Sequence, residues 1–308
     1  MMLPSYRSMN NEGCYMSTQS KKWVCCLTTL IIICTSYLAN LPDIQIAHAN
    51  TRAKSFCNCV VIRMDDVQDY WLNSVQVALI NLFESKNQSA SLGLIMHYVG
   101  NDSKIVNKIN QALPTRLIEL DLHGWNHVNY TKMTENEQKD SLAKANLKMQ
   151  NLFRTKSIVF IPPLDVFNNN TLKAMEALGI RIISSAPYEE NHFNQNRSVF
   201  IANHNNNTSK TRSTSMIYHL PSTIFFKDFE NGKWVKTPLN DIMGNVTRNI
   251  KTYGYAVVVI HPQDFAKSVN GVFTNFVDHS QIADLSRLMD LITLKGIHIV
   301  PFHKIVGI

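Results

Sequence analysis

Two histidines four residues apart, His123 and His127, are the side chains of this chain best suited to bind a metal ion. They follow the mostly apolar run 116–120, which has the composition of a short strand. Imidazole nitrogen is a common ligand of Zn²⁺ and of similar divalent ions. A strand that ends in this pattern places both imidazoles at the open end of a sheet or barrel. Because His-x-x-x-His also occurs by chance on helices and loops, the motif needs a further ligand from elsewhere in the chain.

The adjacent carboxylates Asp65 and Asp66 offer that ligand at the end of a second apolar run, residues 59–64. Two neighbouring carboxylates repel each other unless a cation or a shared proton relieves the repulsion. An aspartate pair can also serve as a helix cap or lie in a solvated turn. Because both motifs end apolar runs, the sequence favours one site built from an aspartate and two histidines. With an open fourth position, this ligand set is typical of a hydrolytic metal centre.

Composition permits a large folded core and gives little support to nucleic-acid binding. The chain has 308 residues, 45% of them hydrophobic, and a formal net charge of +7. The basic residues are scattered along the chain, and no DNA- or RNA-binding motif is present, so nucleic acid is not a predicted partner. The mild positive charge favours contact with acidic polymers or with a membrane surface.

The first 49 residues have the features of a targeting segment. Lys21 and Lys22 precede an apolar run at residues 23–38, and an Ala-x-Ala pattern follows at 47–49. The run is a little shorter than the about 20 residues of a membrane span. We therefore expect residues 1–49 to be a signal peptide cleaved after Ala49 or, alternatively, a membrane anchor through 23–38. A single folded domain is expected at 50–308.

Cysteine and asparagine positions bear on the compartment. Only Cys57 and Cys59 lie beyond the targeting segment. A disulfide between them would span one residue of a strand and would be strained. Two free thiols, or a bond to a cysteine outside the chain, are alternatives. The favoured interpretation is that both cysteines are small apolar residues at the start of a strand. Glycosylation acceptors of the Asn-x-Ser/Thr type indicate an exported glycoprotein. They occur at Asn87, Asn101, Asn129, Asn169, Asn196, Asn206, Asn207 and Asn245.

Apolar strands alternate with amphipathic helices at least six times after residue 58, which predicts an α/β fold with buried, parallel strands. Examples are a helix starting at the capping box of Thr134 and a strand at 255–260. Residues 186–215 are polar and aperiodic and are expected to form an inserted loop. In such folds functional groups gather at the carboxyl ends of the strands. Candidate groups follow four strands: Asp65-Asp66, His123/His127, Pro162-Pro163-Leu164-Asp165 and His261.

With these motifs, the chain resembles the NodB-type polysaccharide deacetylases, carbohydrate esterase family four, as a divergent member. The resemblance covers about residues 58 to 303. It rests on four motifs in the family's order: Asp65-Asp66, His123 to His127, Phe160-Ile161-Pro162-Pro163 and Val259-Ile260-His261.

The resemblance implies a distorted (β/α) barrel of about seven strands with a single divalent ion, Zn²⁺ or, alternatively, Co²⁺ or Ni²⁺. By position, Asp66, His123 and His127 would bind the ion. Asp65 would be the general base for the attacking water, and His261 would be the general acid for the leaving amine. The implied activity is removal of N-acetyl groups from an extracellular or cell-surface glycan by a secreted or membrane-anchored protein.

Three departures from the family pattern concern the supporting residues. The family has Arg directly before the two prolines, where this chain has Ile161, and Arg63 is the residue that would substitute for it. Val67 stands where a Gly is usual. The fourth motif, an Asp and a Trp, has Asp228 and Trp234 as its nearest candidates.

Residues near the expected strand ends are candidates for substrate contact: Trp71, Pro162, Pro163, Asp165 and Asn168. Two alternative functions stay open. One is a non-catalytic relative that binds glycan, which the missing Arg favours. The other is an Asp-Asp phosphatase that uses Mg²⁺, although Mg²⁺ prefers oxygen ligands and would leave the histidines unused.

Overall fold

The computed structural model describes residues 57–186, 200–202, 217–222, 224–230 and 232–308. The chain divides into two compact units, residues 1–53 and 54–308, and the described residues all belong to the second. The predicted targeting segment lies outside the described residues. So do most of the predicted loop 186–215 and the acceptors Asn196, Asn206 and Asn207.

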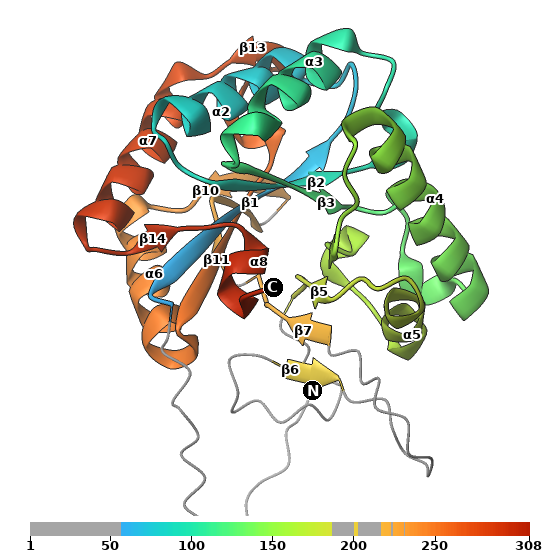
Figure 1. The fold of residues 1–308 in the computed structure, drawn as a ribbon. Coiled ribbons are helices and arrows are strands. Elements are labelled where there is room, and N and C mark those ends of the chain that lie inside the picture. Colours follow the sequence, from blue (N-terminus) through green and yellow to red (C-terminus); the bar gives the residue numbers. More distant parts are fainter. Residues whose placement is uncertain (1–56, 187–199, 203–216, 223, 231) are drawn as a thin grey trace, which may run out of the picture. The chain divides into compact units, whose positions relative to one another are not determined.

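A curled, almost entirely parallel sheet forms the centre of the domain (Figure 1). Its strands follow the order β6-β7-β5-β4-β3-β2-β1-β11-β8, and β14 pairs with β1. All neighbours are parallel except β6, which runs antiparallel to β7. The bounds are β1 Cys59–Val67, β2 Ala90–Leu94, β3 Ile118–Leu122, β4 Val159–Phe160, β5 Ile182–Ile183, β6 Phe200–Ala202, β7 Ile217–His219, β8 Ile224–Phe225, β11 Tyr255–Ile260 and β14 His298–Ile299.

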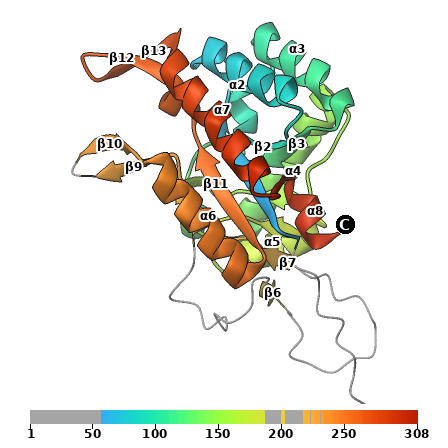
Figure 2. The same ribbon diagram turned by 90° about the vertical axis from the view of Figure 1, so that its left-hand side faces the viewer.

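Helices cover the outside of the sheet (Figures 1 and 2). The long ones are α2 Asn73–Ser85, α3 Ser103–Ala112, α4 Glu135–Phe153, α5 Asn169–Ala177, α6 Leu239–Tyr253 and α7 His279–Leu294. Short 3-10 turns are η2 Met96–Tyr98, η3 Leu113–Thr115, η4 Tyr130–Lys132, η5 Pro163–Asp165 and η6 Pro262–Phe265. The short helix α8, Phe302–Val306, follows β14. Among the described residues, none of the helices has both the length and the apolar character that a membrane span requires.

The two faces of the sheet carry separate apolar cores. Side chains of a strand alternate between its faces, and β1 shows this directly. Val60 and Ile62 pack with the helices in the outer core, whereas Val61 belongs to an inner cluster that Phe302 and Val306 of α8 also join. A strand buried on both faces needs an unbroken apolar sequence, which explains why these strands show no hydrophobic alternation.

The α/β prediction and the (β/α) barrel expectation are confirmed by a curled half-barrel sheet with surrounding helices. The predicted helix after Thr134 and the predicted strand at 255–260 occur at those residues. The third strand begins at Ile118 rather than Arg116, because Arg116 has a left-handed backbone (φ 61°) after η3. The described part of the main sheet has ten strands, where about seven were expected.

Three further differences concern short elements. The predicted aperiodic loop contains β6, which forms through pairing with β7 rather than through any local pattern. Two hairpins, β9 (Lys227–Glu230) with β10 (Lys233–Lys236) and β12 (Ala266–Val269) with β13 (Val272–Val277), project beyond the helices (Figure 2). The second turns at Asn270-Gly271, where both residues have positive φ, as two-residue hairpin turns require.

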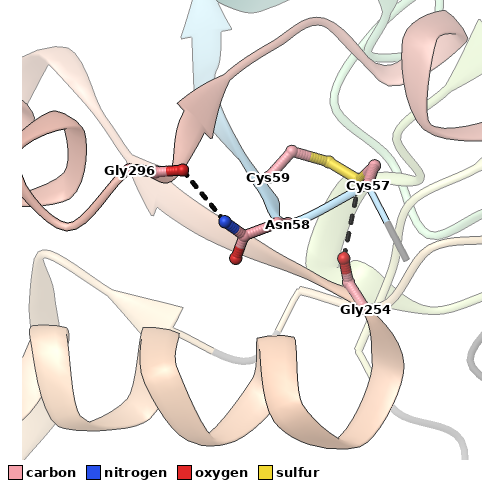
Figure 3. The surroundings of a disulfide bond; sticks show 5 residues. All are labelled: Cys57, Asn58, Cys59, Gly254 and Gly296. Atoms are coloured by element: carbon pink, nitrogen blue, oxygen red, sulfur yellow. Dashed lines mark hydrogen bonds between the residues drawn. A yellow bond between two sulfur atoms is a disulfide. The ribbon is translucent and has the colours of Figure 1, made fainter. Parts of the chain in front are cut away.

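The expectation for the two cysteines was wrong. A disulfide joins Cys57 and Cys59 at the start of β1 (Figure 3). Asn58 between them has a left-handed backbone (φ 47°), and the two Cα atoms lie 5.2 Å apart, within the usual range for a bridge. The Asn58 amide donates a hydrogen bond of 2.9 Å to the carbonyl of Gly296. A strained bridge was expected for a regular strand at Cys57, whereas the chain bends at Asn58 before β1 begins.

Candidate metal centre

A bulge in β1 presents two consecutive carboxylates at the carboxyl end of the sheet. In a regular strand Asp65 and Asp66 would point to opposite faces. The pairing of β1 with β2 shifts register between Met64 and Val67, and Asp66 has a left-handed backbone (φ 61°). Bulges commonly re-aim side chains beside functional sites. Here the bulge places the Asp66 carboxylate against His123 and His127 while Asp65 is held inside the barrel.

Three ligand atoms converge at this edge. Oδ1 of Asp66 lies 3.3 Å from Nε2 of His123 and 3.4 Å from Nε2 of His127. Ligand atoms of the three residues all lie within 4.8 Å of one another. The structure therefore brings together the three residues that the sequence selected as metal ligands. The turn at Gly124, with φ +81°, begins the loop that returns His127 toward His123.

The surroundings prepare these groups for a cation. Nδ1 of His123 donates to the carbonyl oxygen of Ile161 at 2.8 Å, which leaves Nε2 without a proton when the ring is neutral. Burial would raise the pKa of Asp66, but the hydrogen bond and charge of His123 and the charges of His261 and His127 lower it to about 2. Burial, together with the charge of His123, lowers the pKa of His127. The site thus holds an ionised carboxylate facing two imidazoles.

Arg63 forms a buried ion pair with Asp65 on its own strand. Nε donates to Oδ1 at 2.9 Å and Nη2 to Oδ2 at 2.6 Å, so the guanidinium grips both carboxylate oxygens. Nη2 also reaches Asp165 at 3.0 Å, and Nη1 donates to the hydroxyl and carbonyl oxygens of Ser184. Burial would lower the pKa of Arg63, but the charges of Asp65 and Asp165 raise it. The arginine is 1% exposed and stays charged.

The turn after the two prolines supplies the second carboxylate. Leu164 and Asp165 both have left-handed backbones (φ 62° and 55°), which fold the segment back toward β1. Asp165 then accepts from Arg63 and, at 3.3 Å, from the hydroxyl of Ser222. The Asp165 carboxylate is therefore already hydrogen-bonded by Arg63 and Ser222. Ile161, at the position where the family has arginine, is buried in the inner core instead.

His261 follows β11 directly and lies beside a carboxylate that was not among the predicted site residues. Oδ2 of Asp264 accepts from the backbone N–H of His261 at 2.8 Å and lies 3.8 Å from its Nδ1. Burial would lower the pKa of His261, but the hydrogen bond to Asp264 and the charges of Asp65, Asp264 and Asp66 raise it to about 9. The sequence signal was a carboxylate three residues after a histidine that ends a strand. Such spacing closes one 3-10 turn.

Trp234, proposed for the fourth motif, lies in β10 with its ring centroid 6.3 Å from that of His261. It is 42% exposed and forms an aromatic surface next to the histidine. Asp228, the other candidate, lies in β9 opposite Val235. Asp264, which neither candidate anticipated, is a carboxylate in contact with His261.

Gly93 of β2 is a site residue that the sequence argument overlooked. A Cβ atom here would lie 3.2 Å from Cδ1 of Ile161, 3.3 Å from Oδ1 of Asp65 and 3.4 Å from Cβ of His123. The missing side chain therefore lets β1, β3 and β4 bring their inward groups together. A glycine inside a strand is the usual signal for such close approach.

Asp121, two residues before His123, is fully buried. Neither of its carboxyl oxygens makes a hydrogen bond within the described part of the chain. Burial, followed by the charges of Glu119 and Asp65, raises its pKa well above the ordinary value, although the charge of Arg63 opposes the rise. Burial thus favours the neutral form of this carboxyl.

The remaining substrate candidates occupy different surroundings. Pro162 and Pro163 are buried at the end of β4. Trp71 is half-buried and packs against the outer core. The Asn168 side chain caps α5 by accepting from the Thr171 N–H, and its amide donates to the Thr131 carbonyl.

Residues 53–183 match the family model described as polysaccharide deacetylase. The matched region contains the aspartate pair, both histidines and the two prolines. The match confirms, over this region, the resemblance to the NodB-type polysaccharide deacetylases. No curated protein sequence matches the chain.

Solved structures of CE4 proteins share the fold. The Xyl-CE4 domain of a multidomain xylanase from the hindgut metagenome of Trinervitermes trinervoides has a TM-score of 0.51 at 13% identity, covering 81% of this chain and 89% of that chain. A family 4 acetyl xylan esterase from Clostridium thermocellum, in complex with a cobalt ion, has a TM-score of 0.52 at 12% identity, covering 81% and 90%. A CE4 family pseudoenzyme from Bacillus anthracis has a TM-score of 0.51 at 13% identity, covering 80% and 65%.

Proposed function

We propose that this protein is a metal-dependent hydrolase that removes N-acetyl groups from a glycan outside the cytoplasm. The observation that carries the proposal is the convergence of Asp66, His123 and His127 at the carboxyl end of the sheet. Asp65, the base candidate, lies near the carboxyl end of β1, and His261, the acid candidate, directly follows the neighbouring strand β11. The alternation of strands and helices alone would not require these five side chains to share one site.

The donor set fits a single divalent ion. One carboxylate oxygen and two imidazole Nε2 atoms are ligands typical of catalytic Zn²⁺ sites that keep an open position. The hydrogen bond from His123 to the Ile161 carbonyl is the kind of contact that orients a ligating imidazole. When bound, such an ion polarises a carbonyl oxygen and lowers the pKa of water to about 7. Co²⁺ and Ni²⁺ are alternatives for the same donors.

Asp65 and His261 would carry out the two proton transfers of the reaction. Asp65, with both carboxylate oxygens fixed by Arg63, takes a proton from the attacking water as general base. His261 is protonated at neutral pH, since its pKa is raised to about 9 by the carboxylates around it, although burial opposes the rise. It can therefore donate a proton to the departing amine as general acid. The products are acetate and a free amino sugar.

Two features support a glycan substrate outside the cytoplasm. The exposed indole of Trp234 beside His261 offers the kind of apolar face on which a sugar ring stacks. The disulfide between Cys57 and Cys59 is of a kind that persists in oxidising compartments. Together with the apolar run at 23–38 and the glycosylation acceptors, it supports a secreted or membrane-anchored protein.

The test is acetate release from a panel of N-acetylated glycans, with bound metal measured on the same sample. We expect one divalent ion per chain and acetate release from at least one glycan. Asp65→Asn should abolish acetate release while keeping the ion, and His127→Ala should lose both. Lys139→Ala, an exposed change on α4, is the matched control and should retain both.

A non-catalytic glycan-binding relative is the second candidate. The observation that favours it is Ile161 in place of the family's arginine, and one CE4 neighbour is described as a pseudoenzyme. Glycan binding without acetate release from any member of the panel would support this candidate. Phosphate release from phosphoesters with Mg²⁺ in the site would instead support the phosphatase alternative.

A further inference from the structure

A cavity of about 690 Å³ lies at the amino ends of β3 and β4, the opposite end of these strands from the metal ligands. Its walls come from the turn before β3, the segment before β4, and α8 with the residues that precede it. Along β3, Glu119 faces the cavity, whereas His123 follows the other end of the same strand. The cavity is therefore separate from the candidate metal centre.

The charged lining is strongly cationic. Arg116, Lys156 and Lys304 all line the cavity and are exposed. Within the described residues, none of the three forms an ion pair with a carboxylate. Three positive side chains thus line one space, and in the described part of the chain no carboxylate forms an ion pair with them.

Glu119, the acidic side chain of the lining, does not form an ion pair with Arg116, Lys156 or Lys304. Glu119 accepts from the backbone N–H groups of Phe302 and His303, at 2.7 and 3.3 Å, and from Nδ1 of His303 at 2.7 Å. It also accepts from the Ser91 hydroxyl at 2.9 Å. Both carboxylate oxygens of Glu119 are therefore hydrogen-bonded, and these bonds hold the start of α8 in place. The Glu119–His303 pair leaves the charges of the lysines and the arginine available to a ligand.

We propose that this cavity binds a phosphoryl group. A phosphate carries up to two negative charges and several acceptor oxygens, which suits one guanidinium and two ammonium groups around a single space. A carboxylate, with one charge, would leave more of the lining uncompensated. The ligand could be a free phosphate monoester or the phosphodiester of a lipid headgroup.

The test is calorimetric titration of the full chain, held in detergent micelles, with inorganic phosphate. A Lys156→Glu/Lys304→Glu double variant removes two of the three cations. Its matched control, Lys139→Glu/Lys267→Glu, makes the same change in net charge at exposed positions outside the cavity. We expect one phosphate site, and at least about tenfold weaker binding in the cavity variant, since a hydrogen bond to a charged group contributes roughly 1.5–3 kcal/mol. The control should bind like the parent protein.

Competition with glycerophosphoglycerol, a soluble phosphodiester headgroup, identifies the source. Displacement of phosphate assigns the cavity to lipid headgroups, and failure to displace it assigns the cavity to phosphate monoesters. The proposal is overturned if the parent chain binds neither probe, or if the control variant weakens binding as much as the cavity variant. Acetate release on a soluble glycan should be the same in all three proteins, so the outcome is independent of the deacetylase proposal.

Discussion

Arg63 grips both carboxylate oxygens of Asp65, the residue two positions further along the same strand. Because side chains at i and i+2 share one face of a strand, both point into the barrel. The candidate base therefore has its arginine on its own strand, whereas the family resemblance places that arginine before the two prolines. Asp165, from the turn after those prolines, closes the arrangement at 3.0 Å from the same guanidinium.

Removing this arginine should destabilise the fold. Arg63→Met leaves Asp65 buried without its partner, and breaking a buried ion pair costs roughly 3–5 kcal/mol. We expect a loss of that size in the free energy of unfolding, measured in urea. The double variant Arg63→Met/Asp65→Asn should recover part of the lost free energy of unfolding, because it no longer buries an unpaired charge at residue 65. Equal stability of Arg63→Met and the parent protein would show that the pair does not hold the barrel together.

Metal content should depend on the three converging side chains. Asp66→Ala should lower bound divalent metal to near zero and abolish acetate release, because it removes the oxygen ligand between the two imidazoles. A chelator should do the same to the parent protein, and Zn²⁺ or Co²⁺ should restore activity. Asp264→Asn is the matched control for metal content and should keep the ion, since Asp264 lies outside the ligand cluster. Full metal content in Asp66→Ala would contradict the assignment.

The alkaline side of the pH profile should report His261. Its pKa is raised to about 9 by Asp264, Asp65 and Asp66, although burial opposes the rise, and only the protonated ring can act as an acid. Acetate release should therefore fall as pH rises through about 9. Asp264→Asn removes one of the raising charges, so the fall should move to lower pH, by on the order of one unit. An unmoved profile would mean that Asp264 does not set the proton affinity of His261.

Buried His219 should make the fold less stable in mild acid. Burial lowers its pKa from 6.5 to about 4. Between these pH values the ring is protonated in the unfolded chain and neutral in the folded chain. Stability should fall as pH drops from 6.5 toward 4, by about 3 kcal/mol for a shift of this size. His219→Phe keeps a ring against Phe167 and should lose this part of the pH dependence in urea unfolding. His298→Phe, at an exposed position, should behave like the parent protein.

Much of the candidate site could be predicted because its residues end apolar runs. Asp66, His123 and His127 follow strands that local composition reveals, and parallel strands bring their carboxyl ends to one edge. The supporting residues carried weaker signals. Gly93 looked like an ordinary strand glycine, and Asp264 like a residue of a turn.

By itself, then, the sequence determined the alternation of strands and helices, the order of the strand-end motifs and the identity of three converging side chains. Only the tertiary structure decided that a bulge in β1 aims the Asp66 carboxylate at His123 and His127. It also decided that Arg63 forms buried ion pairs with Asp65 and Asp165, and that Cys57 bonds to Cys59. Hydrophobic periodicity is a local property, so it can be read directly from the order of residues. Left-handed turns, close strand approach and buried charge pairs depend on neighbours far along the chain, so they appear only when the barrel has assembled.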